Sequence, residues 1–261
     1  PALFVPMAWP FALVTLVMIG AAGWEWGRLN GASFAAAIGM GILLCVACGA
    51  ALWCGWARVA PKLVWWGATL VWVLGGALAL KGGPPAWPHL SNLLRWVIGL
   101  VALWTAWLAL ANARAVGVNF ILSVFCLVWM ADIAAYFSGR AFGRRKLAPS
   151  ISPGKSWEGV WGGMVGVLVV AVLWIGVDRT GAIDSQSLYT LLLERRGVVT
   201  MVPVLLFLAA MSVVGDLMES LVKRSAGVKD SSALLPGHGG VLDRIDALLP
   251  VFPLALALSS L

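Results

Sequence analysis

Carboxylate side chains lie on both sides of a glycine-rich loop in one polar stretch, residues 220–246 and the turns just before it, in an otherwise apolar sequence. They form two pairs, Asp216 with Glu219 and Asp243 with Asp246. Residues three apart share one face of a helix, so each pair can present its oxygens together. Mg²⁺ prefers such oxygens and usually takes a few of them together with substrate phosphates. The spacing therefore predicts a metal site held by Asp216, Asp243 and Asp246, with Glu219 as a helper.

The alternative interpretation of these carboxylates is structural, as partners of Lys223 and Arg244 in salt bridges on neighbouring turns. Two further features of the stretch favour ligand binding. The glycines of 236–240 let the backbone approach a ligand closely. Positive charge surrounds these glycines, contributed by Lys223, Arg224, Lys229 and Arg244. Together they predict a metal and phosphate site at a membrane surface.

The stretch resembles the signature of phosphatidate cytidylyltransferases, also called CDP-diacylglycerol synthases. The matching positions are Ser220, Lys223, Arg224, Lys229, Asp230, 236–240, Asp243, Arg244 and Asp246. Two upstream segments also resemble the family pattern: D-x-x-A-Y-x-x-G-R from Asp132 and S-P-x-K-S-x-E-G from Ser152. The resemblance extends from Asp132 to about residue 250, and the earlier part matches only as a hydrophobic, multi-span region.

This resemblance implies a nucleotidyltransferase of phospholipid synthesis that condenses CTP with phosphatidate to CDP-diacylglycerol and pyrophosphate, with Mg²⁺ as cofactor. The expected partners are CTP, phosphatidate and membrane lipids, with no nucleic acid. A second cation and a homodimer are left open. The alternatives are another membrane CTP-dependent transferase, such as a polyprenol kinase, and an ion-coupled transporter. The transporter is disfavoured because the sequence has no internal repeat with paired broken helices.

Site roles follow from charge, from placement and from the resemblance. We expect a catalytic group that holds and orients phosphates: Lys223, Arg224, Lys229, Asp230 and Arg244. We expect a substrate-binding group: Asp132, Tyr136, Arg140, Ser152, Lys155, Ser156, His238, Gly239 and Gly240. The segment 152–159 leads into a helix start, and a helix N-terminus with a nearby Lys and Ser is suited to anions.

The composition predicts an all-α, polytopic integral membrane protein. The chain is 61% hydrophobic and 11% charged, and its mean hydropathy is +0.95. The net charge of +7 is spread over short loops between apolar runs, which suits anionic headgroups and polyphosphates better than nucleic acid. About eight runs reach the ~20 residues that cross a bilayer: 9–26, 34–56, 63–80, 93–111, 117–138, 160–177, 198–221 and 245–261.

Alternation of these runs places twelve of the 18 Lys and Arg residues on one side of the membrane. The positive-inside rule assigns that side to the cytoplasm, together with loops 139–158 and 222–244 and hence the site. The expected location is a bacterial inner membrane. We divide the chain into 1–117, for structure, dimerisation or lipid contact, and 118–261, the catalytic region. The resemblance also leads us to expect a ninth, N-terminal helix missing from this sequence.

Two features of residues 1–117 receive structural interpretations. Glu25 lies near the predicted cytoplasmic end of the first span, where we expect it to face lipid headgroups rather than to serve a site. Cys45 and Cys48 have the spacing of a metal or redox motif, but the run around them contains no His or acidic residue. We therefore expect these cysteines to act as small residues in helix packing.

Two polar stripes are expected to face each other inside the bundle. The stripe of the fifth span consists of Asp132, Tyr136 and Arg140. The stripe of the seventh span consists of Asp216, Glu219 and Lys223. Burying either stripe against acyl chains would be costly. We therefore expect a cavity between them that opens to the cytoplasm and, laterally, to the inner leaflet.

Overall fold

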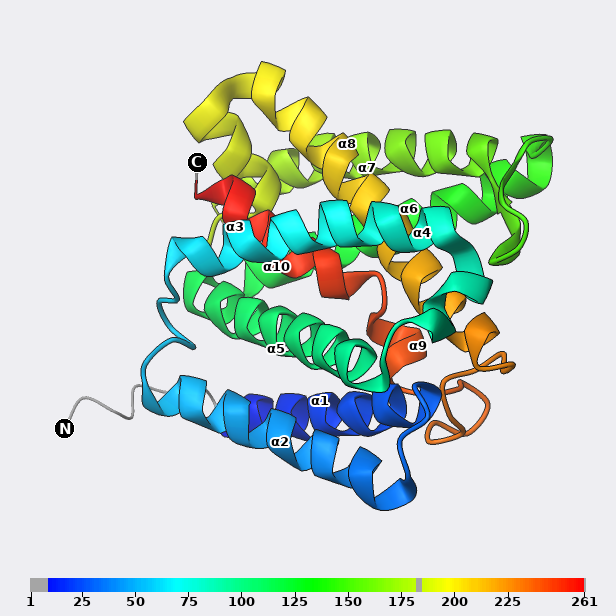
Figure 1. Ribbon diagram of the computed structural model, residues 1–261. Helices are drawn as coiled ribbons and strands as arrows, with labels where there is room; N and C mark the ends of the chain where they lie inside the picture. Colours follow the sequence, from blue (N-terminus) through cyan, green and yellow to red (C-terminus); the bar gives the residue numbers. More distant parts are fainter. Residues whose placement is uncertain (1–8, 182–184, 261) are drawn as a thin grey trace.

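The computed structural model describes residues 9–181 and 185–260. Within these residues, seven helical spans are long and apolar enough to cross a membrane, which confirms the polytopic all-α prediction. They lie side by side with their axes roughly along one direction (Figure 1). The spans are α1 (Trp9–Leu29), α2 (Phe34–Trp53), a continuous unit of α3 (Lys62–Leu70), the π-helical η1 (Val71–Gly75) and α4 (Gly76–Ala86), then α5 (Asn92–Val116), α6 (Val118–Phe142), α7 (Trp157–Asp178) and α8 (Leu188–Ser225).

The last predicted span, 245–261, is different in the structure. It forms the short α9 (Leu242–Ile245) and then α10 (Leu248–Ser259), which has 12 residues. Twelve residues rise about 18 Å, well short of the ~30 Å hydrocarbon layer. Almost every residue of α10 is buried, against α3, α5 and α8. It is therefore a core helix, and its continuous apolarity reflects burial in protein instead of contact with lipid.

Glycines allow α6 and α7 to pack closely. A Cβ atom at Gly163 would lie 2.7 Å from the carbonyl oxygen of Ala131, and one at Gly159 would lie 2.9 Å from that of Ala135. In lipid, helices associate mainly through such close van der Waals packing of small residues. The contact fixes the start of α7 against the end of α6, where the polar connection between them begins.

Two glycines with positive φ bend the longer helical units. Gly83, with φ of 69°, stands before Pro84 and Pro85 and precedes the short 3₁₀ turn η2 (Trp87–His89). Gly197, with φ of 72°, divides α8. Glycine adopts this backbone region without the steric cost that other residues meet. The second bend separates residues 188–196 from the apolar run predicted to begin at 198.

The polar connections gather at one end of the bundle, on the right in Figure 1. They include the antiparallel hairpin of β1 (Lys146–Ala148) and β2 (Ser152–Ser156), the loop after α8, and α9. Arg224 Nε donates to the Ile151 carbonyl at 3.4 Å, so the two loops predicted to share a side do meet.

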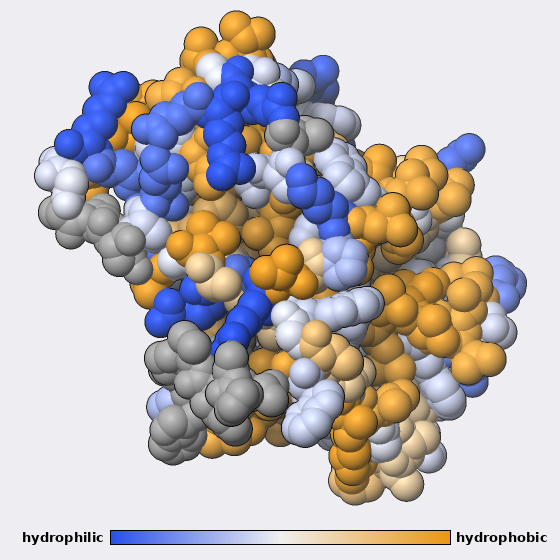
Figure 2. All heavy atoms as spheres, turned by 90° about the vertical axis from the view of Figure 1, so that its left-hand side faces the viewer, coloured by the Kyte–Doolittle hydropathy of each residue, from blue (hydrophilic) through white to orange (hydrophobic). Residues whose placement is uncertain are grey.

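The end of α10 lies at the other end of the bundle, which Figure 2 views directly. Lys62 and Arg195 donate there to the carbonyls of Ser260 and Ser259. Hydrophilic atoms gather in the upper part of this face, and hydrophobic atoms cover much of its right-hand flank (Figure 2). The spans therefore end in two polar faces with apolar sides between them.

We predict that Gly163→Leu lowers the thermal stability of the protein, because the new side chain meets the backbone of α6. Overpacking of this kind typically costs about 1–3 kcal/mol. The matched control is Gly176→Leu in the same helix, where a Cβ meets no atom within 4 Å. Thermal unfolding of the two variants in detergent, followed by Trp fluorescence, measures the difference. Identical midpoints would contradict the close α6–α7 contact.

Candidate functional site

Lys223, in the last turn of α8, is the cation at the centre of the first polar cluster. Its Nζ atom lies 2.5 Å from Asp243 Oδ1 and 2.5 Å from Glu219 Oε2. The lysine is 9% exposed and Glu219 is 3% exposed, so all three charges are largely withdrawn from solvent. Buried charges persist only when they are paired. The salt-bridge interpretation thus holds for Glu219 and Asp243 in this arrangement, and the pairing ties α8 to α9.

Asp243 also organises the loop that precedes it. Its Oδ2 atom accepts hydrogen bonds from the N–H groups of Ser231 and Gly240, at 2.9 and 2.7 Å, and lies 2.8 Å from Ser231 Oγ. Burial opposes ionisation of this carboxyl, but Lys223 and the two N–H groups outweigh it, so the pKa of Asp243 lies well below its usual range. Asp243 is therefore a permanent anion around which the loop closes.

Asp216 and Asp246 form a second group beside the first. A Cβ atom at Gly215 would lie 2.5 Å from the carbonyl oxygen of Asp246, so the turn after α9 packs directly on α8. Asp216 Oδ2 lies 2.6 Å from Lys155 Nζ, and Asp246 Oδ1 accepts from the Ala247 N–H at 2.7 Å. Burial, and then the negative charge of Asp216, raise the pKa of Asp246 above its usual range. Two carboxylates that repel each other in this way suit a shared cation.

Within residues 9–181 and 185–260, no three His, Cys, Asp or Glu side chains form a complete metal cage. Mg²⁺ in phosphate-handling sites usually needs only one or two carboxylates, because water and substrate phosphates supply the other ligands. Asp216 and Asp246 fit this requirement by their oxygen chemistry and their mutual repulsion. Three of the four predicted ligands are paired with a lysine: Asp216 with Lys155, and Asp243 and Glu219 with Lys223. The metal role of each paired carboxylate, which stays a prediction, would require its lysine to move.

Lys155, at the end of the hairpin, joins the upstream motifs to this group. Lys155 contacts Asp216 and also attracts the carboxylate of Asp132 in α6 electrostatically. The negative charge of Asp216 in turn repels that of Asp132. The other members of the α6 stripe, Tyr136 and Arg140, are exposed. Arg140 Nη1 lies 3.4 Å from the Tyr136 hydroxyl oxygen. The structure therefore brings Lys155 to Asp216, with Asp132 close enough to interact with both. All three members of the α6 stripe are exposed.

The start of α7 uses its polar residues to hold the hairpin. Ser156 is the N-cap and accepts from the Gly159 N–H at 3.2 Å. Glu158 accepts from the N–H groups of Arg144 and Arg145 at 3.1 and 3.2 Å. Ser152 is half-buried on β2. In this arrangement Ser156 acts as a cap, while its predicted substrate contact stays a prediction.

The glycine cluster is required by the loop's own packing. Gly239 has φ of 78°, and a Cβ atom at Gly240 would lie 2.0 Å from Ser231 Oγ and 2.4 Å from Glu25 Oε1. The sequence interpretation was that these glycines allow a ligand to approach the backbone. In the structure they allow the loop to close over a serine and a carboxylate.

The outer side of the loop carries the remaining predicted residues. Arg244 Nε and Nη2 donate to the His238 carbonyl at 3.0 and 2.5 Å, and Arg224 Nη1 donates to the Val228 carbonyl at 3.0 Å. The side chains of Arg224, His238 and Arg244 are exposed, as are those of Lys229 and Asp230. The structure thus provides an exposed, mainly cationic rim around the buried carboxylates.

Glu25 of α1 is part of this region, and the expectation that it faces headgroups is wrong. It is 0% exposed, and its carboxylate accepts from the N–H groups of Val241 and Leu242 at 2.9 and 2.7 Å. Ser232 Oγ donates to it at 2.5 Å, and Ser231 Oγ lies 3.3 Å away. The signal that points to it is the rule that a carboxylate within a span faces the protein interior.

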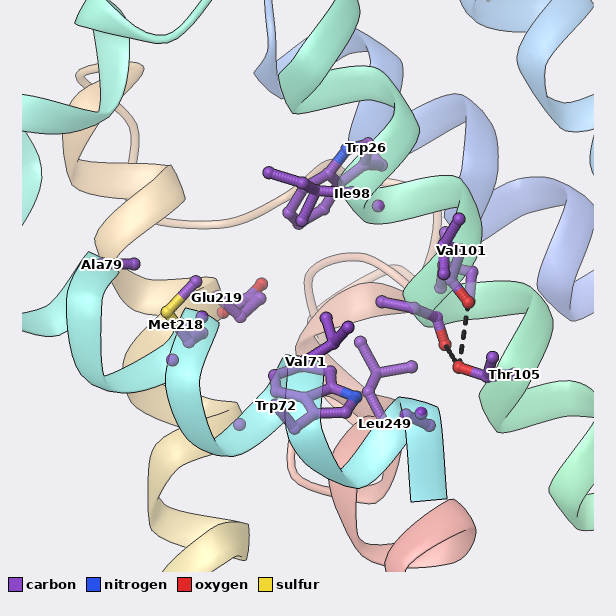
Figure 3. Close-up of a pocket in the computed structure, with 18 of the residues that line it drawn as sticks. Trp26, Val71, Trp72, Ala79, Ile98, Val101, Thr105, Met218, Glu219 and Leu249 are labelled. Carbon is purple, nitrogen blue, oxygen red and sulfur yellow. Dashed lines mark hydrogen bonds between the residues drawn. The ribbon is translucent and has the colours of Figure 1, made fainter. Parts of the chain in front are cut away.

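The prediction of two facing stripes holds only in part. Asp132 does interact with Asp216, but Glu219 and Lys223 face a different side of α8, toward Asp243. Glu219 also lines an apolar cavity among α3, α4, α5 and α10 (Figure 3). On α8, Asp216 therefore belongs to the polar contact with Lys155, whereas Met218 and Glu219 line the cavity.

Comparison with known proteins points to the same family that the sequence motifs resemble. Residues 1–261 match the model of the cytidylyltransferase family. The chain is 41% identical over 257 residues to a phosphatidate cytidylyltransferase of Pseudomonas aeruginosa. This match covers 95% of this chain and 87% of the relative. It is 50% identical over 137 residues to one of Haemophilus influenzae, and 41% identical over 146 residues to one of Staphylococcus saprophyticus. These matches cover 52% and 56% of this chain, and 44% and 50% of those relatives.

We predict that Glu25→Ala loosens the loop of residues 226–241. The substitution leaves the buried N–H groups of Val241 and Leu242 unpaired, and each unsatisfied donor costs about 1–3 kcal/mol. Limited trypsin digestion should therefore cut after Lys229 faster than in the unmodified protein. The control is Glu194→Ala, which removes an exposed carboxylate that pairs with Gln186. Equal cleavage in both variants would show that Glu25 does not hold the loop.

Proposed function

The chain belongs to the cytidylyltransferase family, and from this premise we propose how its residues transfer the cytidylyl group of CTP to phosphatidate. The products are CDP-diacylglycerol and pyrophosphate. The observation that carries the proposal is the Lys155–Asp216 contact of 2.6 Å. It joins two motif segments distant in the sequence into one polar site at the ends of membrane-spanning helices, where a lipid headgroup and a soluble nucleotide can meet.

The reaction needs positioning and charge compensation more than a reactive side chain. A phosphate oxygen of phosphatidate attacks the α-phosphorus of CTP, the new phosphoanhydride bond forms, and the bond to pyrophosphate breaks. The attacking oxygen is already ionised, so no protein nucleophile is required. Both reactants are polyanions, and their repulsion is the main electrostatic barrier. Fixed cations and a closed, preorganised site lower such a barrier.

Asp216 and Asp246 would hold Mg²⁺, which, when bound, supplies positive charge to the phosphate oxygens. Lys155 stands beside this pair and is placed to bind a phosphate oxygen. Lys223 has a different task, because it is buried between two carboxylates: it fixes Asp243 and, through it, the loop. The exposed Arg224, Lys229 and Arg244 attract CTP from the aqueous side, and Tyr136 and Arg140 are the exposed groups of α6 available to the lipid headgroup.

The orientation in the membrane follows the positive-inside argument. We place the site on the cytoplasmic side of a bacterial inner membrane, supported by the bacterial relatives and by the gathering of loops 139–158 and 222–244 at one end. CTP would then reach the site directly from the cytoplasm.

We predict that Asp246→Asn and Asp216→Asn each reduce turnover by at least about tenfold, which corresponds to about 1.4 kcal/mol of lost transition-state stabilisation. Each removes a charged oxygen from the pair. Purified protein, radiolabelled CTP and phosphatidate give the measurement as pyrophosphate release, with Glu194→Gln as the control. Near-normal rates in both Asn variants at saturating Mg²⁺ would count against the assignment. Release of CDP with a lipid alcohol would instead indicate a kinase.

We predict that a cysteine at Ser150, on the hairpin, is protected from an impermeant thiol reagent in intact cells and reacts after permeabilisation. Ser150 is exposed at the site end of the bundle. The native Cys54, exposed after the far end of α2, serves as the matched comparison and should react in intact cells. Each site is tested with the other changed to serine. The reverse pattern would place the site outside the cytoplasm.

A further inference from the structure

A cavity of about 310 Å³ lies beside α8, which lines it with Gly215, Met218 and Glu219. Its walls come from α3, η1, α4, α5, α8 and α10, and they are almost entirely apolar. Figure 3 shows Val71, Trp72 and Leu249 on one side of the space, with Trp26 and Ile98 on another. Away from Glu219 and Thr105 the space offers few polar partners to water, which needs two to four of them.

The cavity is elongated along the helices. The lining residues of the α3–η1–α4 unit recur at every fourth position, so they form one ridge: Leu63, Gly67, Val71, Gly75 and Ala79. At 1.5 Å per residue this ridge extends about 24 Å, most of the thickness of a hydrocarbon layer. The shape is that of a slot parallel to the bundle axis, which suits a hydrocarbon chain better than a compact molecule.

One part of the slot meets the site. Glu219 points into it (Figure 3) and is 3% exposed, and its Oε1 atom has no hydrogen-bond partner among the residues that the structure describes. Gly215, which packs against Asp246, and Leu242, which precedes Asp243, also line the slot. The polar group and the apolar slot are therefore separated only by the last turns of α8 and by α9.

The slot also reaches the surface of the spans. Three of its lining residues, Leu63, Val71 and Val101, are 82%, 55% and 46% exposed, and all lie within helices long enough to cross the membrane. A molecule that enters there comes from the hydrocarbon layer. An occupant must therefore be apolar and elongated, with a polar end that can lie beside the catalytic carboxylates.

We propose that this slot binds one acyl chain of phosphatidate while the headgroup lies at Asp216 and Asp246. The assignment rests on the proposed function and adds a binding subsite for the lipid's hydrocarbon part. It also relocates the lateral entrance. The sequence predicted an opening between α6 and α8, whereas the slot opens among α3, α4 and α5. The N-terminal half of the chain then contributes directly to substrate selection.

Two glycines allow the slot to be filled without disturbing the protein. A Cβ atom at Gly67 or Gly75 meets no atom within 4 Å, although both residues line the slot. Leucine at either position adds side-chain volume to the slot and is favoured over glycine in a helix. Gly176→Leu is the matched control, since its Cβ is equally unobstructed and it does not line the slot.

Steady-state kinetics with dioleoyl and dioctanoyl phosphatidate test the proposal. Gly67→Leu and Gly75→Leu should raise KM for the dioleoyl lipid by about tenfold, the effect of displacing roughly two methylene groups. They should leave KM for CTP and for the dioctanoyl lipid within about twofold, and Gly176→Leu should change neither. Equal behaviour of all three variants would overturn the slot assignment. Absence of turnover in the unmodified protein would overturn the proposed function instead.

Photolabelling provides a second measurement that does not depend on catalysis. Phosphatidate with a diazirine near the end of one acyl chain should label residues 63–79 or 98–105, and Gly75→Leu should reduce that labelling. Equal labelling by phosphatidylcholine with the same photoreactive chain would show a general lipid contact, and the proposal would be wrong. Labelling confined to α6 and α7 would have the same consequence.

Discussion

The ion pairs of Lys223 hold the candidate site together. A lysine that is only 9% exposed would be strongly destabilising alone, and so would its partners Glu219 and Asp243. Paired, they fix the end of α8 to the start of α9, and Asp243 in turn closes the preceding loop through Ser231 and Gly240. Removing Lys223 would leave its two carboxylate partners uncompensated where water cannot replace the lost charge. The conformation of the loop therefore depends on the ion pairs between Lys223 and its two carboxylate partners.

Glu25 adds a second anchor to the same loop from the other end of the sequence. Its carboxylate holds the N–H groups at the start of α9, while Asp243 holds those before it. Two anions thus fix the backbone on both sides of the glycine cluster, and the glycines have no side chains that would keep these anions away. The site depends on α1 as much as on the helices that carry its motifs.

The sequence located the charged residues that gather in the candidate site, because local spacing determines which residues share a face of α8 or lie in one loop. Their roles in the reaction stay predictions. The sequence also located the spans, since the length and apolarity of a run decide whether it can cross a bilayer. Glu25 was misjudged because its partners are more than 200 residues away, and no local pattern encodes that contact. The segment 245–261 was misjudged because lipid contact and complete burial in protein demand the same apolar composition.

The short helix α10 affects the order in which the protein can be made. Its 12 residues fill the centre between α3, α5 and α8, and the turn that precedes it carries Asp246. A growing chain can insert all seven spans before this helix exists, but it then contains an unfilled interior and half of its carboxylate pair. Docking of α10 thus fills the centre of the bundle and places Asp246 beside α8 in a single event.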